Sequence, residues 1–200
     1  ILSRGRFAEE HFLKAYEMGI RQIISLGAGL DAFAFKFPHL DSTISIFELD
    51  HPNTQNIKKK RMTARGLKSP HNHHFIPIDF TKEMISDVLL HSKIDLSKPV
   101  YITWMGVTYY LPLEDITKTL KSLGNILAAN SQVSFDFMDE RLFNDDFLKA
   151  HPLLEQNIRK FFKFTEEKGE PLLSGLSAPS LENLLKETQW TLKETLSGLE

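Results

Sequence analysis

The sequence contains no cysteine, so a disulfide framework and a thiolate metal site are both excluded. It has no apolar run long enough to span a membrane and no recognisable signal peptide. Charge of one sign is also scarce, because the formal net charge is −2 and the one sustained basic run is Lys58-Lys59-Lys60-Arg61. These absences favour a cytoplasmic protein that binds neither nucleic acid nor a membrane.

The apolar content of the sequence suits one folded domain. Of its 200 residues, 42% are hydrophobic, which is enough for a single α/β domain with a substantial core and too little for a second full domain. The chain begins at Ile1 instead of methionine and stops at Glu200 without an obvious terminus. We therefore expect one domain over residues 1–200 that lacks both of its terminal segments.

Two short β-rich segments, each followed by a ligand-type turn, organise the sequence. Residues 23–26 are apolar enough for a buried parallel strand, and Gly27 and Gly29 permit a sharp turn where a ligand can contact backbone N–H groups. The second segment ends in Glu48 and Asp50, roughly twenty residues later, where an acid would meet ribose hydroxyls. This pairing predicts a nucleoside cofactor.

The glycine turn itself is compatible with more than one nucleoside, because residues 27–32 also satisfy the loose G-x-G-x-x-G/A pattern of dinucleotide sites. Asp31 favours a ligand without phosphate, since a carboxylate in the first turn of the following helix would compete with a pyrophosphate for the same positive field. S-adenosylmethionine carries an ammonium and a sulfonium, which acidic residues stabilise. Asp31 can equally act as a helix cap.

Hydrophobic periodicity and turn residues predict alternating helices and strands. Helices, or helical turns, are expected over residues 4–18, 29–37, 53–65, 82–90, 113–128 and 181–188. Strands are expected over residues 23–26, 43–49, 74–78, 99–106, 131–137 and 191–196. Pro38 would end the second helix, Thr81 would cap the fourth and Ser180 the last. Residues 139–177 are expected to form a helical insertion that can act as a lid.

Candidate ligand-binding side chains lie at the ends of these elements. Arg4 and Arg6 begin the first helix, where an arginine can pair with the carboxylate of a bound amino-acid moiety, although simple surface arginines are the alternative. Asp79 follows the third strand, at the edge where open parallel sheets bind ligands. It can accept a hydrogen bond from an adenine amino group while Phe80 covers the ring; a turn aspartate beside a core phenylalanine is the alternative.

Tyrosines and histidines supply the remaining candidates. Tyr109 and Tyr110 follow the fourth strand on a loop where substrate and cofactor would meet. The closeness of His71, His73 and His74 is compatible with a metal site, but no carboxylate and histidine nearby have the spacing of a metal-binding helix. There is also no G-x-S-x-G motif or cysteine nucleophile. We interpret the histidines as a loop that leads into a strand, and we expect no metal.

Five motifs occur in order along the chain: Arg4-Gly5-Arg6-Phe7, Leu26-Gly27-Ala28-Gly29-Leu30-Asp31, Phe47-Glu48-Leu49-Asp50-His51-Pro52, Pro77-Ile78-Asp79-Phe80 and Gly106-Val107-Thr108-Tyr109-Tyr110-Leu111-Pro112. In this order and spacing they resemble the leucine carboxyl methyltransferase-like family of S-adenosylmethionine-dependent methyltransferases, in its bacterial O-methyltransferase branch. The resemblance covers most of the chain up to about the fifth strand. It implies a Rossmann-like class I methyltransferase fold, in which helices flank a mainly parallel central sheet whose antiparallel last strand lies beyond Glu200.

The resemblance also implies roles for residues that contact the cofactor. One arginine of the pair Arg4 and Arg6 would hold the cofactor carboxylate. Gly27, Ala28 and Gly29 would lie along its methionine portion.

At the nucleoside end of the cofactor, the resemblance implies that acidic side chains bind the sugar and the base. Asp50, more than Glu48, would bind the ribose. Asp79 and Phe80 would frame the adenine.

Two departures from the family pattern bear on activity. Ala32-Phe33 stands where the family usually has Thr-Arg, and Met105 stands where it usually has a glutamate. Met105 would border the cofactor, so a negative charge that would face the cation is missing. We expect cofactor binding to survive and activity to be altered or weak.

The chemistry expected of such a site is simple. Methyl transfer from a sulfonium is an in-line displacement, in which alignment and exclusion of water supply most of the catalysis. A carboxylate acceptor needs no general base, whereas a hydroxyl or phenol does, and Tyr109 or Tyr110 can orient either. The leading hypothesis is an S-adenosylmethionine-dependent O-methyltransferase acting on a carboxylate or hydroxyl of a small molecule or peptide end. The alternatives are a catalytically silent cofactor-binding protein and a nicotinamide-dependent oxidoreductase.

Overall fold

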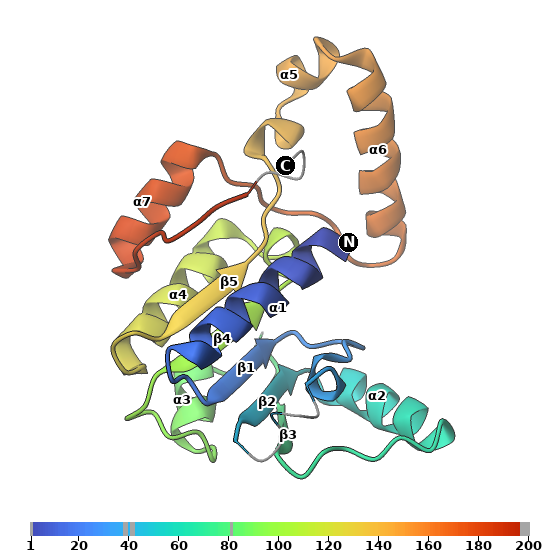
Figure 1. The fold of residues 1–200 in the computed structure, drawn as a ribbon. Coiled ribbons are helices and arrows are strands. Elements are labelled where there is room, and N and C mark those ends of the chain that lie inside the picture. The colour runs from blue at the N-terminus through green and yellow to red at the C-terminus, as the bar shows by residue number, and fades with distance from the viewer. Residues whose placement is uncertain (1, 38–39, 41–42, 81, 197–200) are drawn as a thin grey trace. The chain divides into compact units, whose positions relative to one another are not determined.

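The structure is a computed structural model that describes residues 2–37, 40, 43–80 and 82–196 (Figure 1). The chain divides into two compact units. The first consists of Ile1–Met105 and Asn125–Phe135, and the second of Gly106–Gly124 and Asp136–Glu200.

Five parallel strands form the sheet of the first unit, in the order β3-β2-β1-β4-β5. Ile24 of the central β1 pairs in register with Phe47 of β2 and Ile102 of β4. All residues of β1 and β4 are buried, which fits their near-continuous apolar sequence, so the predicted α/β fold with a parallel sheet is confirmed. The strands are β1 (Gln22–Leu26), β2 (Ser45–Asp50), β3 (His73–Pro77), β4 (Val100–Trp104) and β5 (Gln132–Phe135).

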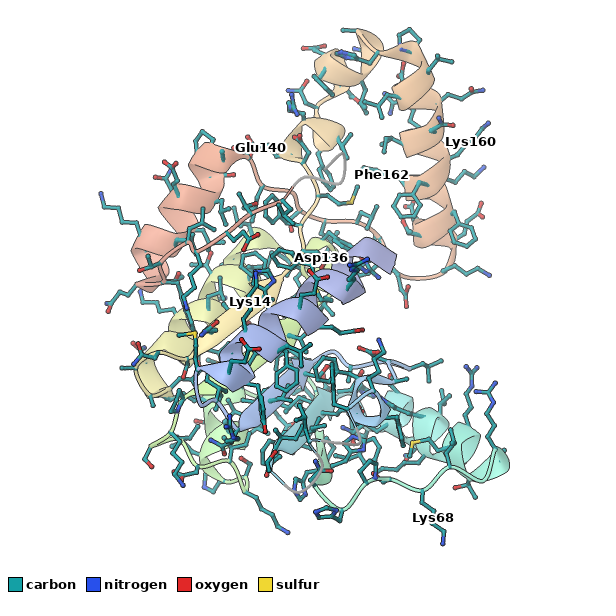
Figure 2. All side chains as sticks on the ribbon, viewed as in Figure 1. Lys14, Lys68, Asp136, Glu140, Lys160 and Phe162 are labelled. Atoms are coloured by element: carbon teal, nitrogen blue, oxygen red, sulfur yellow. The ribbon has the colours of Figure 1, made fainter. Side chains whose placement is uncertain are left out.

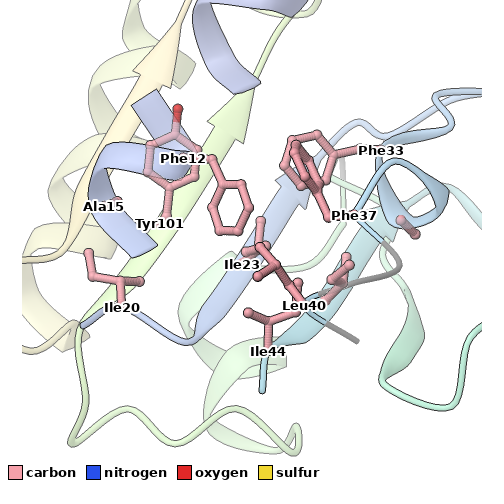
Figure 3. Packing of buried hydrophobic residues seen from close by; sticks show 11 residues of the cluster. Phe12, Ala15, Ile20, Ile23, Phe33, Phe37, Leu40, Ile44 and Tyr101 are labelled. Atoms are coloured by element: carbon pink, nitrogen blue, oxygen red, sulfur yellow. The ribbon is translucent and has the colours of Figure 1, made fainter. Parts of the chain in front are cut away.

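An aromatic cluster forms the core between the first helix and the sheet of this unit (Figure 3). The ring of Phe12 is fully buried, with centroids 5.1 Å from Phe37 and 5.5 Å from Phe33. The hydroxyl of Tyr101 on β4 donates to the carbonyl of Ala8 at 2.8 Å, which joins the helix to the sheet. The helices of this unit are α1 (Leu2–Glu17), α2 (Pro52–Ala64) and α3 (Ile85–Leu90).

The second unit is helical. Trp190 donates its indole N–H to the carbonyl of Leu120 at 2.9 Å, which fixes the chain after the last helix to α4. Inside the insertion, Phe162 packs on Phe143 with 5.1 Å between ring centroids. The elements are η3 (Thr108–Tyr110), α4 (Leu113–Ile126, whose last residues belong to the first unit), η4 (Glu140–Phe143), α5 (Asp145–Lys149), α6 (Pro152–Glu167) and α7 (Ala178–Thr188).

The predicted sixth strand is wrong. Residues 191–196 are all exposed and form no strand, because no neighbouring strand in the described chain offers them backbone partners. The cap predicted for the last helix is displaced as well. Ser177 is the N-cap of α7, and Ser180 closes the capping box from the third helical position.

Two helix starts also differ from the predictions. Only a short 3-10 turn, η1 (Phe33–Phe35), follows the glycine loop, with Ala32 as its uncapped N-terminal residue, so Asp31 is not a helix cap. Helix α3 begins at Ile85, later than expected. The stop predicted at Pro38 and the cap predicted at Thr81 lie outside the described residues. None of the described helices combines the length and apolar character needed to cross a bilayer.

Candidate functional site

The glycine loop after β1 is held on the end of β2. Gly27 and Gly29 have φ values of 64° and 50°, a left-handed conformation that favours glycine. The Gly27 N–H donates to the carbonyl of Leu49 at 2.8 Å, and the Asp31 N–H donates to the carbonyl of Ala28 at 2.9 Å. Ala28 is buried, whereas Gly27 and Gly29 are half-buried, so a ligand on this loop would contact the two glycines.

Asp50 shapes this loop with both carboxylate oxygens. Its Oδ2 accepts the Gly29 N–H at 2.5 Å, and its Oδ1 accepts the His51 N–H at 2.6 Å. A carboxylate has about four acceptor positions, so Asp50 can bind the loop and still accept from a diol. The predicted pairing of glycine loop and strand-end acid is therefore a direct contact in the structure.

Glu48, the other acid predicted for the ribose, is turned to a structural role. Its side chain is 2% exposed, and Oε2 accepts from Lys58 Nζ at 2.5 Å. His73 Nε2 lies 3.1 Å from Oε1, without the alignment of a hydrogen bond. The side-chain amide of Gln55 donates to the carbonyls of Glu48 and Ile76, at 3.0 and 2.9 Å. Glu48 thus fastens α2 to the end of β2 and offers no exposed oxygen to a ligand.

The two candidate arginines lie on different faces of α1. Positions two apart on a helix are separated by about 200° around its axis, so Arg4 and Arg6 cannot face the same ligand. Arg6 is exposed and pairs with Glu10 at 2.7 Å, and this hydrogen bond raises the pKa of Arg6. Arg4 lies one turn before Ala8, on the face that also buries Phe12. Arg4 is therefore the better candidate for a ligand carboxylate.

Asp79 lies close to Asp50 at the carboxyl edge of the sheet. His51, which follows Asp50, has its Nε2 3.9 Å from Asp79 Oδ2, and the same oxygen accepts from Lys82 Nζ at 2.8 Å. That hydrogen bond raises the pKa of Lys82. Phe80 is 40% exposed, so part of its ring is open to a ligand.

The tyrosines belong to the second unit. The rings of Tyr109 and Tyr110 are 4.7 Å apart between centroids, at 61°. Sequence reasoning missed the residue that secures their loop, Asp136, which accepts the Gly106 N–H at 2.7 Å and is labelled in Figure 2. The signal that marks Asp50 and Asp79, an acid at the end of a strand, was present at Asp136 too. Met105, the last residue before this loop, is half-buried in the first unit.

Other features of the first unit do not add to this site. A groove of about 990 Å³ lies between β3 and α3, and none of the predicted site residues lines it. The histidines pair with protein groups, as when His73 Nδ1 contacts Ser69 Oγ at 2.7 Å. Within the described parts of the chain, no three acidic or histidine side chains converge as metal ligands would.

Comparison with known proteins connects this geometry to a family. The family model described as leucine carboxyl methyltransferase matches residues 1–124. YktD of Bacillus subtilis, named as a candidate S-adenosyl-L-methionine-dependent methyltransferase, is 31% identical over 196 residues, which cover 98% of this chain and 62% of YktD. A protein of Mycobacterium ulcerans with the same description is 34% identical over 134 residues, covering 64% of this chain and 42% of that protein.

A solved structure supports the fold. An O-methyltransferase family protein from Burkholderia thailandensis superposes with a TM-score of 0.61 at 13% identity, over 98% of this chain and 56% of that one. The chain spans less than two thirds of the length of the curated relatives it matches. The matched residues 1–124 include all of the predicted site residues and exclude the helical insertion.

Proposed function

The chain belongs to the leucine carboxyl methyltransferase family, and we propose that it uses S-adenosylmethionine to methylate an oxygen of a carboxylate or hydroxyl on a small molecule or peptide end. The observation that carries the proposal is the contact between the glycine loop and Asp50. It joins the two motifs from which a nucleoside site was predicted, and it does so inside the region that the family shares.

The chemistry of the loop fits a cationic nucleoside better than a dinucleotide. Glycine-rich loops bind pyrophosphate through free backbone N–H groups. Here the N–H groups of Gly27, Ala28 and Gly29 already donate to Leu49 and Asp50, so the loop has few donors left for phosphate. The charged groups at the loop are instead two acids, the exposed Asp31 and the adjacent Asp50, which favour a ligand that carries positive charge. This argument disfavours the nicotinamide-dependent alternative.

Arg4, the glycine loop, Asp50 and Asp79 of the first unit would each contact a different part of the cofactor. Arg4 would pair with the cofactor carboxylate, and the backbone of Gly27 to Gly29 would lie along the methionine portion. Asp50 would accept from the ribose hydroxyls while it holds Gly29. Asp79 would accept from the adenine amino group.

The tyrosine pair would orient the methyl acceptor. When bound, the cofactor supplies an activated methyl group, so the chain has to orient the acceptor oxygen and exclude water. Tyr109 and Tyr110 are suited to orienting a carboxylate or hydroxyl through their phenol groups. A tyrosine is a poor base at neutral pH, which favours acceptors that are already ionised.

Calorimetric titration of the chain with S-adenosylmethionine, and separately with NADH, tests the cofactor. We expect binding heat with the first ligand and none with the second. Heat with NADH alone would replace the proposal by the oxidoreductase, and heat with neither would remove both cofactors.

Turnover of methyl-labelled cofactor across carboxylic acids, phenols and peptides with a free carboxyl end tests the reaction. We expect label to move to a carboxylate or phenol oxygen. Binding without transfer to any acceptor would favour the silent cofactor-binding protein, which Met105 and the altered Ala32-Phe33 pair make a specific second candidate.

A further inference from the structure

The loop that carries the tyrosine pair is fastened at its start by one aspartate. Gly106, with a φ of 77°, donates its N–H to Asp136 Oδ1 at 2.7 Å. The hydroxyl of buried Thr108 donates to the backbone carbonyl of Asp136. Because one acceptor is a carboxylate, the Gly106 hydrogen bond is of the stronger, charge-assisted kind. Asp136 therefore holds two points of the loop immediately before Tyr109.

The same loop is fastened at its end by the last part of the helical insertion. The Tyr109 carbonyl accepts the N–H of Leu173 at 2.8 Å and lies 3.4 Å from the N–H of Ser174. Ser174 Oγ also contacts the Thr108 carbonyl at 3.4 Å. The tyrosine loop is thus held between Asp136, just before the insertion, and residues 173–174 in the last part of the insertion.

These two segments meet at the base of the insertion. The Leu176 N–H donates to the Met138 carbonyl at 2.8 Å, and the Glu140 N–H donates to the Leu176 carbonyl at 3.3 Å. Gly175 makes this approach possible, since a Cβ at that position would lie 2.8 Å from backbone atoms of Glu140. Asp136 and Glu140, both labelled in Figure 2, therefore begin and end one braced segment.

We propose that Asp136 is a positioning residue: its carboxylate holds Gly106 and thereby sets the place of Tyr109 and Tyr110, at the point where the chain approaches the insertion. The proposal rests on the proposed function, in which these tyrosines orient the methyl acceptor. If an acceptor contacts the insertion, the resulting shift would be passed to the tyrosines through residues 136–140 and 173–176. Asp136 itself need not touch the acceptor or the cofactor.

Hydrogen exchange of the full chain, followed by mass spectrometry, tests the local effect. In Asp136→Ala the Gly106 N–H loses its acceptor, so we expect exchange of peptides spanning residues 105–112 to rise about tenfold. Asp136→Asn keeps an acceptor oxygen and should stay within about twofold of wild type. Asp146→Ala is the matched control, because this carboxylate lies in the same unit and is 95% exposed.

Near-ultraviolet circular dichroism adds a signature of the tyrosine pair. The difference between wild type and Tyr110→Phe defines the contribution of the coupled rings. We expect Asp136→Ala to lose this contribution and Asp136→Asn to retain it. Unchanged hydrogen exchange and unchanged dichroism in Asp136→Ala would overturn the proposal. Exchange in Asp136→Asn as fast as in Asp136→Ala would also overturn it.

Cofactor titration and methyl transfer separate this role from the proposed function. We expect Asp136→Ala to bind S-adenosylmethionine within about twofold of wild type while kcat falls by about tenfold or more, with rescue by Asp136→Asn. Equal loss of cofactor affinity and kcat would overturn the positioning role. Absence of binding heat in the wild-type chain would overturn the proposed function instead.

Discussion

Each unit of the molecule contains a glycine whose N–H is held by an aspartate at the end of a strand. In the first unit Gly29 donates to Asp50, and in the second Gly106 donates to Asp136. Both glycines have positive φ and follow a strand, and the aspartates lie at the end of the neighbouring strand: Asp50 is the last residue of β2, and Asp136 comes directly after β5. The two contacts are alike in chemistry but differ in what supports them.

The structure around Asp50 is buried, whereas Asp136 leads into an insertion with exposed residues. Two residues before Asp50, Glu48 is buried and paired with Lys58, so a buried ion pair to α2 fixes the end of β2. Asp136 is instead followed by the helical insertion, whose longest helix leaves Phe161 and Phe164 exposed. Under the proposed function, the loop expected to bind the cofactor therefore rests on a buried ion pair. Under the same proposal, the loop expected to orient the acceptor is tied to an insertion with an exposed surface.

Breaking the buried ion pair between Glu48 and Lys58 should have the largest effect. Lys58→Met leaves the carboxylate of Glu48 buried without its ammonium partner, and losses of this kind destabilise by about 3–5 kcal/mol. Urea unfolding should show that loss, whereas Lys60→Met on the exposed face of α2 should change little. Adding Glu48→Gln to Lys58→Met should recover part of the stability. If Lys58→Met unfolds at the wild-type urea concentration, the buried Glu48–Lys58 pair does not stabilise the end of β2, and the contrast between the two aspartates is wrong.

Removing the first aspartate should weaken cofactor binding more than stability. Asp50→Ala takes away the acceptor of two backbone N–H groups and of the expected ribose contacts, a loss of about 3 kcal/mol or roughly a hundredfold in affinity. Asp50→Asn can still accept from Gly29 through its one carbonyl oxygen, so about a tenfold loss is expected. Calorimetry with S-adenosylmethionine measures both. Wild-type affinity in Asp50→Ala would mean that the cofactor lies elsewhere.

Both partners of the first contact could be singled out from the sequence as ligand-binding residues, although not as partners of each other, whereas the sequence singled out neither partner of the second. Gly27, Gly29 and Asp50 stand out because the spacing of a tight turn and a later acid is itself a pattern. Gly106 and Asp136 were placed inside the predicted strands 99–106 and 131–137, because both segments are rich in residues that favour strands. Those strands end earlier, at Trp104 and Phe135, where the backbone leaves the ladder.

The same reason explains the other differences. The predicted strand at 191–196 was inferred from local composition, but a strand exists only where a neighbour supplies hydrogen bonds, and none of the described strands does so. Glu48 and Asp50 look equivalent in sequence, and only the packing of Lys58 from α2 separates a buried acid from one that faces a loop. The parallel sheet itself was predicted correctly because long apolar runs leave few other solutions.

Disturbing the base of the insertion should have a moderate effect that is confined to the second unit. In Gly175→Ala the new Cβ would lie 2.9 Å from the Met138 carbonyl oxygen, so the backbone has to shift, at about 1–3 kcal/mol. Hydrogen exchange should rise around residues 105–112 and 138–140 while cofactor affinity stays at the wild-type value. Gly169→Asn is the control, since Gly169 has open space around it and asparagine tolerates its φ of 77°. A loss of cofactor affinity in Gly175→Ala would show that the two loops are not independently supported.

Restoring a charge beside the first loop should have the smallest effect. Met105→Glu places a carboxylate where the family usually has one, and an acid near a cationic ligand at a half-buried position contributes about 0.5–1 kcal/mol, or a twofold to fivefold gain in affinity. Met105→Gln has the same length without the charge and should bind like wild type. Calorimetry at two salt concentrations separates charge from shape, because only the electrostatic part weakens as salt rises. An equal gain in both variants would assign the effect to packing, and no gain in either would place Met105 outside the electrostatic field of the cofactor.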